Sequence, residues 1–119
     1  MGKMRDLGIN GVFVYYHEPH SDERGTFCRH LDMSEMRERL VNYHISYTAT
    51  TRNTEAFTWR GMHYQLSPYA EGKLVSVVQG SMLDIVLDLR LNSTTNTKAI
   101  RVEMEMGDVQ AARNKAEMR

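Results

Sequence analysis

Short alternations of hydrophobic and polar positions dominate the chain, and this period of two residues is typical of half-buried β-strands. The aromatic and β-branched run over 11–16 predicts one strand, which ends at a polar turn that contains Pro19. A second polar turn over 21–25 leads into a predicted strand over 26–30. The same alternation predicts further strands, over 42–51 and 99–106.

Helical signals occur in two places. Asp32 can cap a short helix of about two turns, with Glu35 at its third position. Apolar residues recur there at helical spacing, at Met33, Met36 and Leu40. Residues 108–119 contain helix formers without an apolar stripe, which predicts a helical or frayed tail. The sequence therefore predicts an all-β domain over 1–106, followed by a polar tail over 107–119.

The clearest predicted unit is a pair of strands over 73–78 and 81–90, joined at Gln79-Gly80. A tight hairpin turn there would place Lys73 diagonal to Asp84. Because strand side chains alternate, one face would then gather Lys73, Val75, Val77, Met82, Asp84, Val86 and Asp88, and the other Leu74, Leu83, Ile85, Leu87 and Leu89. We expect the second face to pack and the first to line a pocket.

Composition narrows the class of protein. The 119 residues allow one domain with a modest core. Lysine and arginine (15) balance aspartate and glutamate (15), so no global field favours nucleic acid or a membrane surface. The single cysteine, Cys28, excludes an intramolecular disulfide and fits a reducing compartment. Because we find neither an apolar run of roughly 18 residues nor a signal-type start, we expect a cytoplasmic protein.

The candidate chemistry lies in the stretch 59–65 and in the residues that follow Glu71. Arg60, His63 and Lys73 stand on strand-like segments, from which a rigid sheet can direct all three into one cavity. Such groups are costly to desolvate unless a ligand compensates them, so the cluster indicates a site for an anionic substrate. The residues alone also allow a half-buried strand histidine at position 63 and a structural ion pair between Lys73 and Asp84.

Several motifs occur in order along the chain: Asp22-Glu23-Arg24-Gly25-Thr26-Phe27, Arg60-Gly61-Met62-His63-Tyr64-Gln65, Lys73-Leu74-Val75, Gly80, Asp84-Ile85-Val86-Leu87-Asp88-Leu89-Arg90 and Ser93-Thr94-Thr95. Together they resemble the dTDP-4-dehydrorhamnose 3,5-epimerase family of the cupin superfamily, over about residues 12–106. The resemblance implies a cupin-type jelly roll (a double-stranded β-helix), usually a homodimer. It also implies epimerisation of dTDP-4-keto-6-deoxyglucose at C3 and C5 in dTDP-rhamnose biosynthesis, without cofactor or metal.

The resemblance also implies roles for individual residues. The family's base matches His63, and the lysine that stabilises the enolate oxygen matches Lys73. Asp84 is expected to support this pair rather than to act as a base. The family's arginines that hold the pyrophosphate and neighbouring groups of the substrate match Arg24 and Arg60. The phenylalanine that borders the sugar nucleotide matches Phe27. Part of each pocket is expected from the second subunit.

These residue types suit proton abstraction beside a ketone. The proton there is acidic because the resulting enolate is delocalised, so a base has to be paired with a positive donor at the carbonyl oxygen. An imidazole exchanges protons near neutral pH, and a lysine ammonium is a compact charge suited to one oxygen. The planar fork of arginine suits phosphate.

The chain departs from the family pattern after Met106. The family continues into a Pro-x-Gly-Phe-Ala-His-Gly-Phe segment, a proton-donating tyrosine and an acidic partner of the histidine. Residues 107–119 contain no tyrosine, histidine or phenylalanine. Because inversion needs a proton on the opposite face of the carbon, we expect reprotonation to be slowed or left to water. Missing strands would also expose sheet edges and invite association with another copy or another polypeptide.

Two alternatives to an active epimerase stay open. The first is a truncated, catalytically impaired relative that only binds a nucleotide sugar. The second, less favoured, is a metal-dependent cupin. Gln65, a poor metal ligand, stands where many cupins have the second of two histidines, although Glu71 lies downstream.

Overall fold

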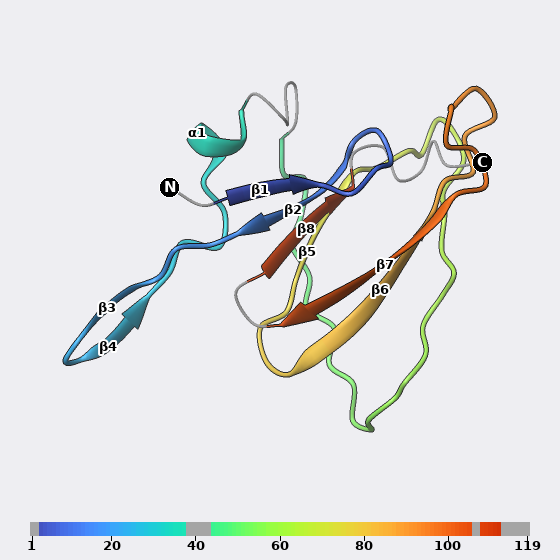
Figure 1. Cartoon of the computed structure of the whole chain (residues 1–119). Coiled ribbons are helices and arrows are strands. Elements are labelled where there is room, and N and C mark those ends of the chain that lie inside the picture. Colours follow the sequence, from blue (N-terminus) through green and yellow to red (C-terminus); the bar gives the residue numbers. More distant parts are fainter. Residues whose placement is uncertain (1–2, 38–43, 106–107, 113–119) are drawn as a thin grey trace.

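Two facing layers of antiparallel β-structure form the body of the chain (Figure 1). The computed structural model describes the backbone of residues 3–37, 44–105 and 108–112, and the side chains of 3–37 and 44–105. One layer is a four-stranded sheet of, in order, β1 (Lys3–Asp6), β2 (Val12–Tyr16), β8 (Asp108–Ala112) and β5 (Lys73–Ser76). The other layer pairs β6 (Ser81–Leu87) with β7 (Ala99–Glu105). The predicted all-β class is confirmed.

The hydrophobic core lies between the two layers. It consists of two buried clusters, one of Ile9, Val12 and Val86 and one of Val14, Val77, Val102 and Met104. On the opposite face of β2, Phe13 and Tyr15 pack against Met36 of helix α1 (Met33–Met36). Because β2 buries both of its faces, its sequence is a continuous apolar run rather than an alternation. The strand predicted over 11–16 is confirmed.

Helix α1 begins where the capping signal predicts. The carboxylate of Asp32 accepts a hydrogen bond from the backbone N–H of Ser34 at 3.0 Å. The hydrogen bonds from Ser34, followed by the guanidinium of Arg29 at 2.8 Å, lower the pKa of Asp32 to about 2. The described helix spans Met33–Met36, and Leu40 lies outside the described residues. Nowhere in the described part of the chain is a helix long and apolar enough to cross a membrane.

The hairpin predicted between β5 and β6 is wrong. β5 pairs with β8, and β6 pairs along its whole length with β7, from Ser81 opposite Glu105 to Leu87 opposite Ala99. The connection after β5 therefore carries the chain from one layer to the other. A turn signal such as Gln79-Gly80 predicts a reversal of the chain but does not choose the partners of the flanking strands.

The alternation of side chains along β6 is correct, but the assignment of its faces is reversed. Val86 is fully buried between the layers, and Met82 packs against the same core. Leu83, expected on the packed face, is 45% exposed. The face that includes Asp84 is therefore the inner, packed face of this layer.

Residues 44–72 form no strand in the described structure, so the strands predicted over 44–51 and 59–65 are wrong, and residues 42 and 43 lie outside the described residues. The segment runs outside the two layers (Figure 1). Its large exposed apolar side chains are Ile45, Tyr47, Phe57, Trp59, Met62, Tyr64, Leu66 and Tyr69. Alternation shows where a strand can form, but a strand also needs a neighbour for its backbone groups, and no described strand pairs with this segment.

The helix predicted at the start of the tail is also wrong. Residues 108–112 form β8, which lies between β2 and β5 in the first sheet. Gln110 stands opposite both Val14 and Val75 in the register. Pairing on both sides overrides the local helix propensity of these residues. Residues 113–119 lie outside the described structure.

Candidate active site

Lys73 lies on the inner face of the first sheet. The register places Lys73 opposite Ala112, and Ala112 opposite Val12. Residues opposite one another in neighbouring strands share a face, so Lys73 stands on the same face as Val12, which packs toward the second layer. Lys73 begins β5 and its side chain is 41% exposed, which places its ammonium at the rim of the space between the layers.

Asp84 faces the same space from the second layer. It stands between Met82 and Val86 on the inner face of β6, opposite Val102. Its Oδ2 is buried and has no hydrogen-bond partner in the described structure. An unsatisfied buried carboxylate oxygen costs free energy, and a donor supplied by a ligand or by a moving side chain would remove that cost.

Glu71 is the observed ion-pair partner of Lys73. Its Oε1 lies 4.0 Å from the Lys73 Nζ, and its Oε2 accepts a hydrogen bond from the hydroxyl of Tyr47 at 3.4 Å. Among the described residues, no ion pair joins Lys73 to Asp84. Tyr47 and Glu71 were not among the residues predicted for the site. The spacing Glu-Gly-Lys was a signal for Glu71, whereas no sequence signal pointed to Tyr47.

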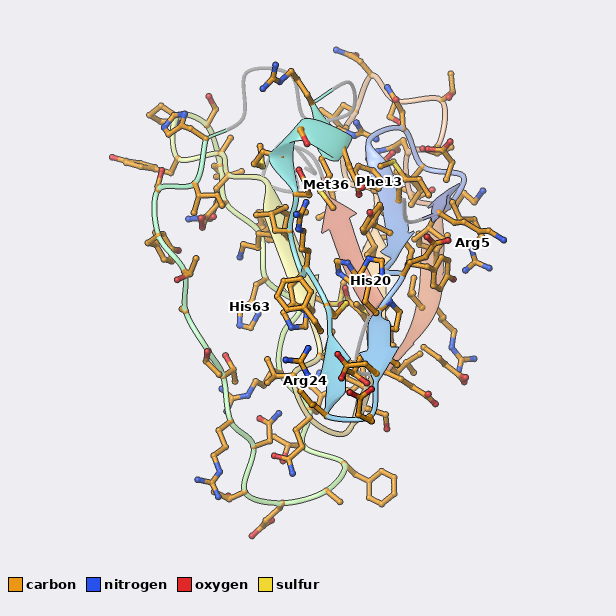
Figure 2. All side chains as sticks on the ribbon, turned by 90° about the vertical axis from the view of Figure 1, so that its left-hand side faces the viewer. Arg5, Phe13, His20, Arg24, Met36 and His63 are labelled. Atoms are coloured by element: carbon orange, nitrogen blue, oxygen red, sulfur yellow. The ribbon has the colours of Figure 1, made fainter. Side chains whose placement is uncertain are left out.

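His63 lies on the exposed, extended segment rather than on a strand (Figure 2). Gly61 precedes it with a φ of +107°, which side chains rarely tolerate. A Cβ at Gly61 would stand 3.3 Å from the His63 Nδ1, so the imidazole ring lies close to the glycine backbone. In the described structure, no hydrogen bond or ion pair joins His63 to Lys73.

Arg60 lies on the same extended segment and is exposed. Its Nε donates a hydrogen bond to the side-chain oxygen of Asn53 at 2.7 Å. That bond ties the two ends of a loop together and leaves the rest of the guanidinium facing solvent. Arg60 is thus available to an anion.

Arg24 and Phe27 lie on a separate element, the hairpin of β3 (His20–Asp22) and β4 (Gly25–Phe27). Figure 1 shows this hairpin projecting from one side of the body, and Figure 2 shows Arg24 at its tip. Arg24 pairs with Asp22 at 2.7 Å, which lowers the pKa of that carboxyl, and Phe27 is 64% exposed. Residues 57–66 lie on the opposite side of the body in Figure 1, so one chain does not bring Arg24 and Phe27 to His63.

A stack of rings stands at the root of the hairpin. The rings of Tyr15 and His17 meet edge to face at 4.9 Å, and those of His17 and His30 at 5.6 Å. The Tyr15 hydroxyl also donates a hydrogen bond to Glu35 of α1. The stack therefore ties both ends of the hairpin to the body. Within the described residues, no three His, Cys, Asp or Glu side chains form a group that could hold a metal ion.

The chain is similar to known proteins in both sequence and structure. A family model described as dTDP-4-dehydrorhamnose 3,5-epimerase matches residues 6–112. The curated dTDP-4-dehydrorhamnose 3,5-epimerase of Shigella flexneri is 33% identical over 98 residues, which are 81% of this chain and 53% of the relative. The crystal structure of the enzyme from Elizabethkingia anophelis superposes with a TM-score of 0.82, at 24% identity, over 95% of this chain and 63% of that one. The structure of the Bacillus anthracis enzyme, with TDP and PPi bound, superposes with a TM-score of 0.84, at 23% identity, over 95% of this chain and 67% of that one.

The two facing sheets and these superpositions define the fold class as a cupin-like jelly roll, of which this chain contains a part. The match over residues 6–112 goes further, and the chain belongs to the dTDP-4-dehydrorhamnose 3,5-epimerase family. It spans about half the length of the curated relatives it matches, 53% and 51% for the first two.

Proposed function

We propose that the chain acts as an epimerase on the 4-keto-6-deoxy sugar of a nucleotide, with dTDP-4-keto-6-deoxyglucose as substrate and C3 and C5 as the inverted carbons. The observation that carries the proposal is the family match, because it spans the motifs that contain His63 and Lys73. A nucleotide-sugar ligand is supported by the structures of two similar proteins. One holds TDP and PPi, and the other, from Legionella pneumophila, is a complex with dTDP-4-keto-L-rhamnose.

In the proposed reaction, the imidazole of His63 removes the proton from the carbon beside the ketone. The C–H bond electrons form a double bond to the carbonyl carbon, the π electrons of the ketone move onto its oxygen, and the imidazolium of His63 holds the proton. His63 suits this task because an imidazole can accept a proton near neutral pH. Its exposed position leaves it accessible to a substrate.

Lys73 is proposed to stabilise the enolate oxygen. Its ammonium stands at the rim of the space between the layers, where a compact positive charge can reach one oxygen of a bound sugar. The carboxylate of Asp84 faces the same space with a buried oxygen that lacks a donor. We propose that Asp84 accepts a hydrogen bond from Lys73 or from a sugar hydroxyl when substrate is bound. The carbon then regains a proton from solvent on the opposite face.

Substrate binding is proposed to involve both ends of the molecule. Arg60 stands on the same segment as His63, whereas Arg24 and Phe27 stand on the projecting hairpin. A guanidinium can bind a pyrophosphate through paired hydrogen bonds, and an exposed aromatic ring can cover a sugar nucleotide. Because Arg24 and Phe27 lie away from His63 within one chain, we propose that they complete the site of a second copy in a homodimer.

The extent of exposed surface supports this association. The accessible surface is 9202 Å², whereas a compact monomer of this mass exposes about 6,600 Å². The radius of gyration is 15.1 Å, against about 13.5 Å for a compact chain of this length. Excess surface with many exposed apolar side chains is typical of a protein that buries part of it against a partner.

A second candidate function is binding of the nucleotide sugar without turnover. One observation favours it. His63 has no carboxylate partner among the described residues to orient its ring. This candidate predicts saturable binding of dTDP without any loss of the C3 and C5 protons.

Proton NMR in heavy water tests the proposal. With dTDP-4-keto-6-deoxyglucose, the unaltered chain is expected to replace the C3 and C5 protons by deuterium, and His63→Ala is expected to abolish this exchange while calorimetry still detects dTDP binding. Binding without exchange in the unaltered chain would instead support the second candidate. Neither binding nor exchange would contradict both.

A further inference from the structure

The carboxylate of Glu71 bridges two side chains from distant parts of the sequence. One of its oxygens lies 4.0 Å from the Lys73 ammonium, and the other accepts the Tyr47 hydroxyl at 3.4 Å. Only Gly72 separates Glu71 from Lys73, whereas Tyr47 stands on the extended segment, 24 residues before Glu71. The bridge therefore connects that segment to the start of β5.

This bridge adds little to folding stability. The side chains of Lys73 and Glu71 are 41% and 31% exposed, and exposed ion pairs contribute little to stability. The hydrogen bond from Tyr47 is long, and Tyr47 is itself exposed. The effect of the bridge is instead local, because it favours one position of the ammonium of the flexible Lys73 side chain.

Lys73 contacts one carboxylate, and a second carboxylate faces the space between the two layers. Glu71 holds the ammonium at the rim, and Asp84 offers an unsatisfied oxygen deeper between the layers. A lysine that stabilises one developing negative charge has to be charged and directed before the reaction, because disorder of the ammonium costs entropy at each turnover. A nearby carboxylate meets both needs.

We propose that Glu71, held by Tyr47, is a positioning residue for the Lys73 ammonium. The inference rests on the proposed function, because it assigns Lys73 to the enolate oxygen. Glu71 acts through Lys73 and need not contact the substrate. The prediction is that Glu71→Gln lowers kcat about fivefold with KM changed less than about twofold, and that Glu71→Asp restores part of the loss.

Competitive acylation of lysine residues tests the inference without turnover. The full chain is treated with limiting acetic anhydride, and mass spectrometry gives the rate at Lys73 relative to Lys98, whose Nζ lies 3.3 Å from the Gly8 carbonyl. Loss of the contact with Glu71 leaves the Lys73 side chain more accessible to the reagent, so Glu71→Gln is expected to raise the relative rate at Lys73 about threefold. Tyr47→Phe is expected to change it in the same direction, by less.

Two control variants match the chemistry of the change. Glu55→Gln removes an exposed carboxylate from the same segment, and Tyr69→Phe removes an exposed hydroxyl close to Glu71 in the sequence; neither is expected to alter the ratio. An unchanged Lys73 ratio in Glu71→Gln would overturn the inference. A higher Lys73 ratio in Glu71→Gln, together with no deuterium exchange in the unaltered chain, would support the positioning of Lys73 and contradict the epimerase function. The failure of the inference and the failure of the proposed function are therefore distinguishable.

Discussion

The buried carboxylate of Asp88 holds the loop after β6 together through the hydrogen bonds that it accepts. It is fully buried, and Arg90 donates to both of its oxygens, from Nε at 2.9 Å and from a terminal nitrogen at 3.0 Å. The hydroxyls of Ser93 and Thr95 each lie 2.6 Å from its Oδ2. These partners, Arg90 above all, hold the pKa of Asp88 well below its usual range. The structure of this loop thus explains why four residues of the motif are present, without a contact to substrate: Asp88, Arg90, Ser93 and Thr95.

Replacing Asp88 by asparagine is expected to lower the free energy of unfolding by roughly 3 kcal/mol, because it leaves Arg90 without its charged partner. Chemical denaturation followed by circular dichroism measures the change. The exposed Asp22→Asn is the control and is expected to leave the midpoint unchanged. Equal, small effects of the two substitutions would contradict the account of this loop.

The same carboxyl predicts an acid dependence. Because the folded-state pKa of Asp88 is depressed, its contribution to stability is present above the unfolded pKa of about 3.9 and is lost as the pH falls below that value. The difference in stability between the unaltered chain and Asp88→Asn should therefore be constant from neutral pH down to about pH 5 and shrink below it.

Gly61 is the residue that sets the position of His63. A Cβ there would add backbone strain at a φ of +107° and would stand 3.3 Å from the imidazole Nδ1. Gly61→Ala is expected to shift the His63 ring resonances in NMR spectra and to slow deuterium exchange about tenfold. Gly80→Ala is the matched control, because Gly80 has a φ of +85° but its added Cβ would meet nothing within 4 Å. Identical effects of both substitutions would show that strain alone is responsible.

At the scale of elements, the sequence could predict structure that depends on neighbours in the chain. β2, β7 and the cap at Asp32 follow from local apolar runs and side-chain chemistry, and these predictions are confirmed. Pairing between distant strands could not be read in this way. The Gln79-Gly80 turn connects two layers, and residues 108–112 become a strand because β2 and β5 lie on either side.

The candidate site shows the same limit. The motif residues Arg60, His63 and Lys73 were recognisable by type and order, but the sequence did not show that Lys73 stands on the inner, packed face of its sheet. The bridge from Tyr47 to Glu71 depends on a contact between residues 24 positions apart, so no local pattern indicated it. Likewise, the sequence could not show that the hairpin of Arg24 and Phe27 projects away from His63.

The hairpin is the element on which the proposed dimer depends. Both of its strands are exposed throughout, and Phe27 is its large apolar side chain. Phe27→Asp is expected to shift the chain from dimer to monomer, because burying a charge in the interface is costly. Light scattering after size exclusion should give twice the 13.8 kDa chain mass for the unaltered protein and the chain mass for the variant.

The control for this substitution is Val78→Asp, at a residue that is similarly exposed but lies after β5. It is expected to leave the dimer intact. A monomeric unaltered chain, or a dimer that survives Phe27→Asp, would remove the hairpin from the proposed interface.

For the whole molecule, we propose that His63 and Lys73 act together on one ketosugar, although they stand on different segments. The direct test is the rate of deuterium incorporation at C3 and C5 in the unaltered chain, His63→Ala, Lys73→Ala and the double variant. We expect each single substitution to lower the rate at least about a hundredfold, and the double variant to be no slower than the slower single variant, because the two residues act as one unit. Full activity in either single variant, or losses that multiply in the double variant, would contradict the claim.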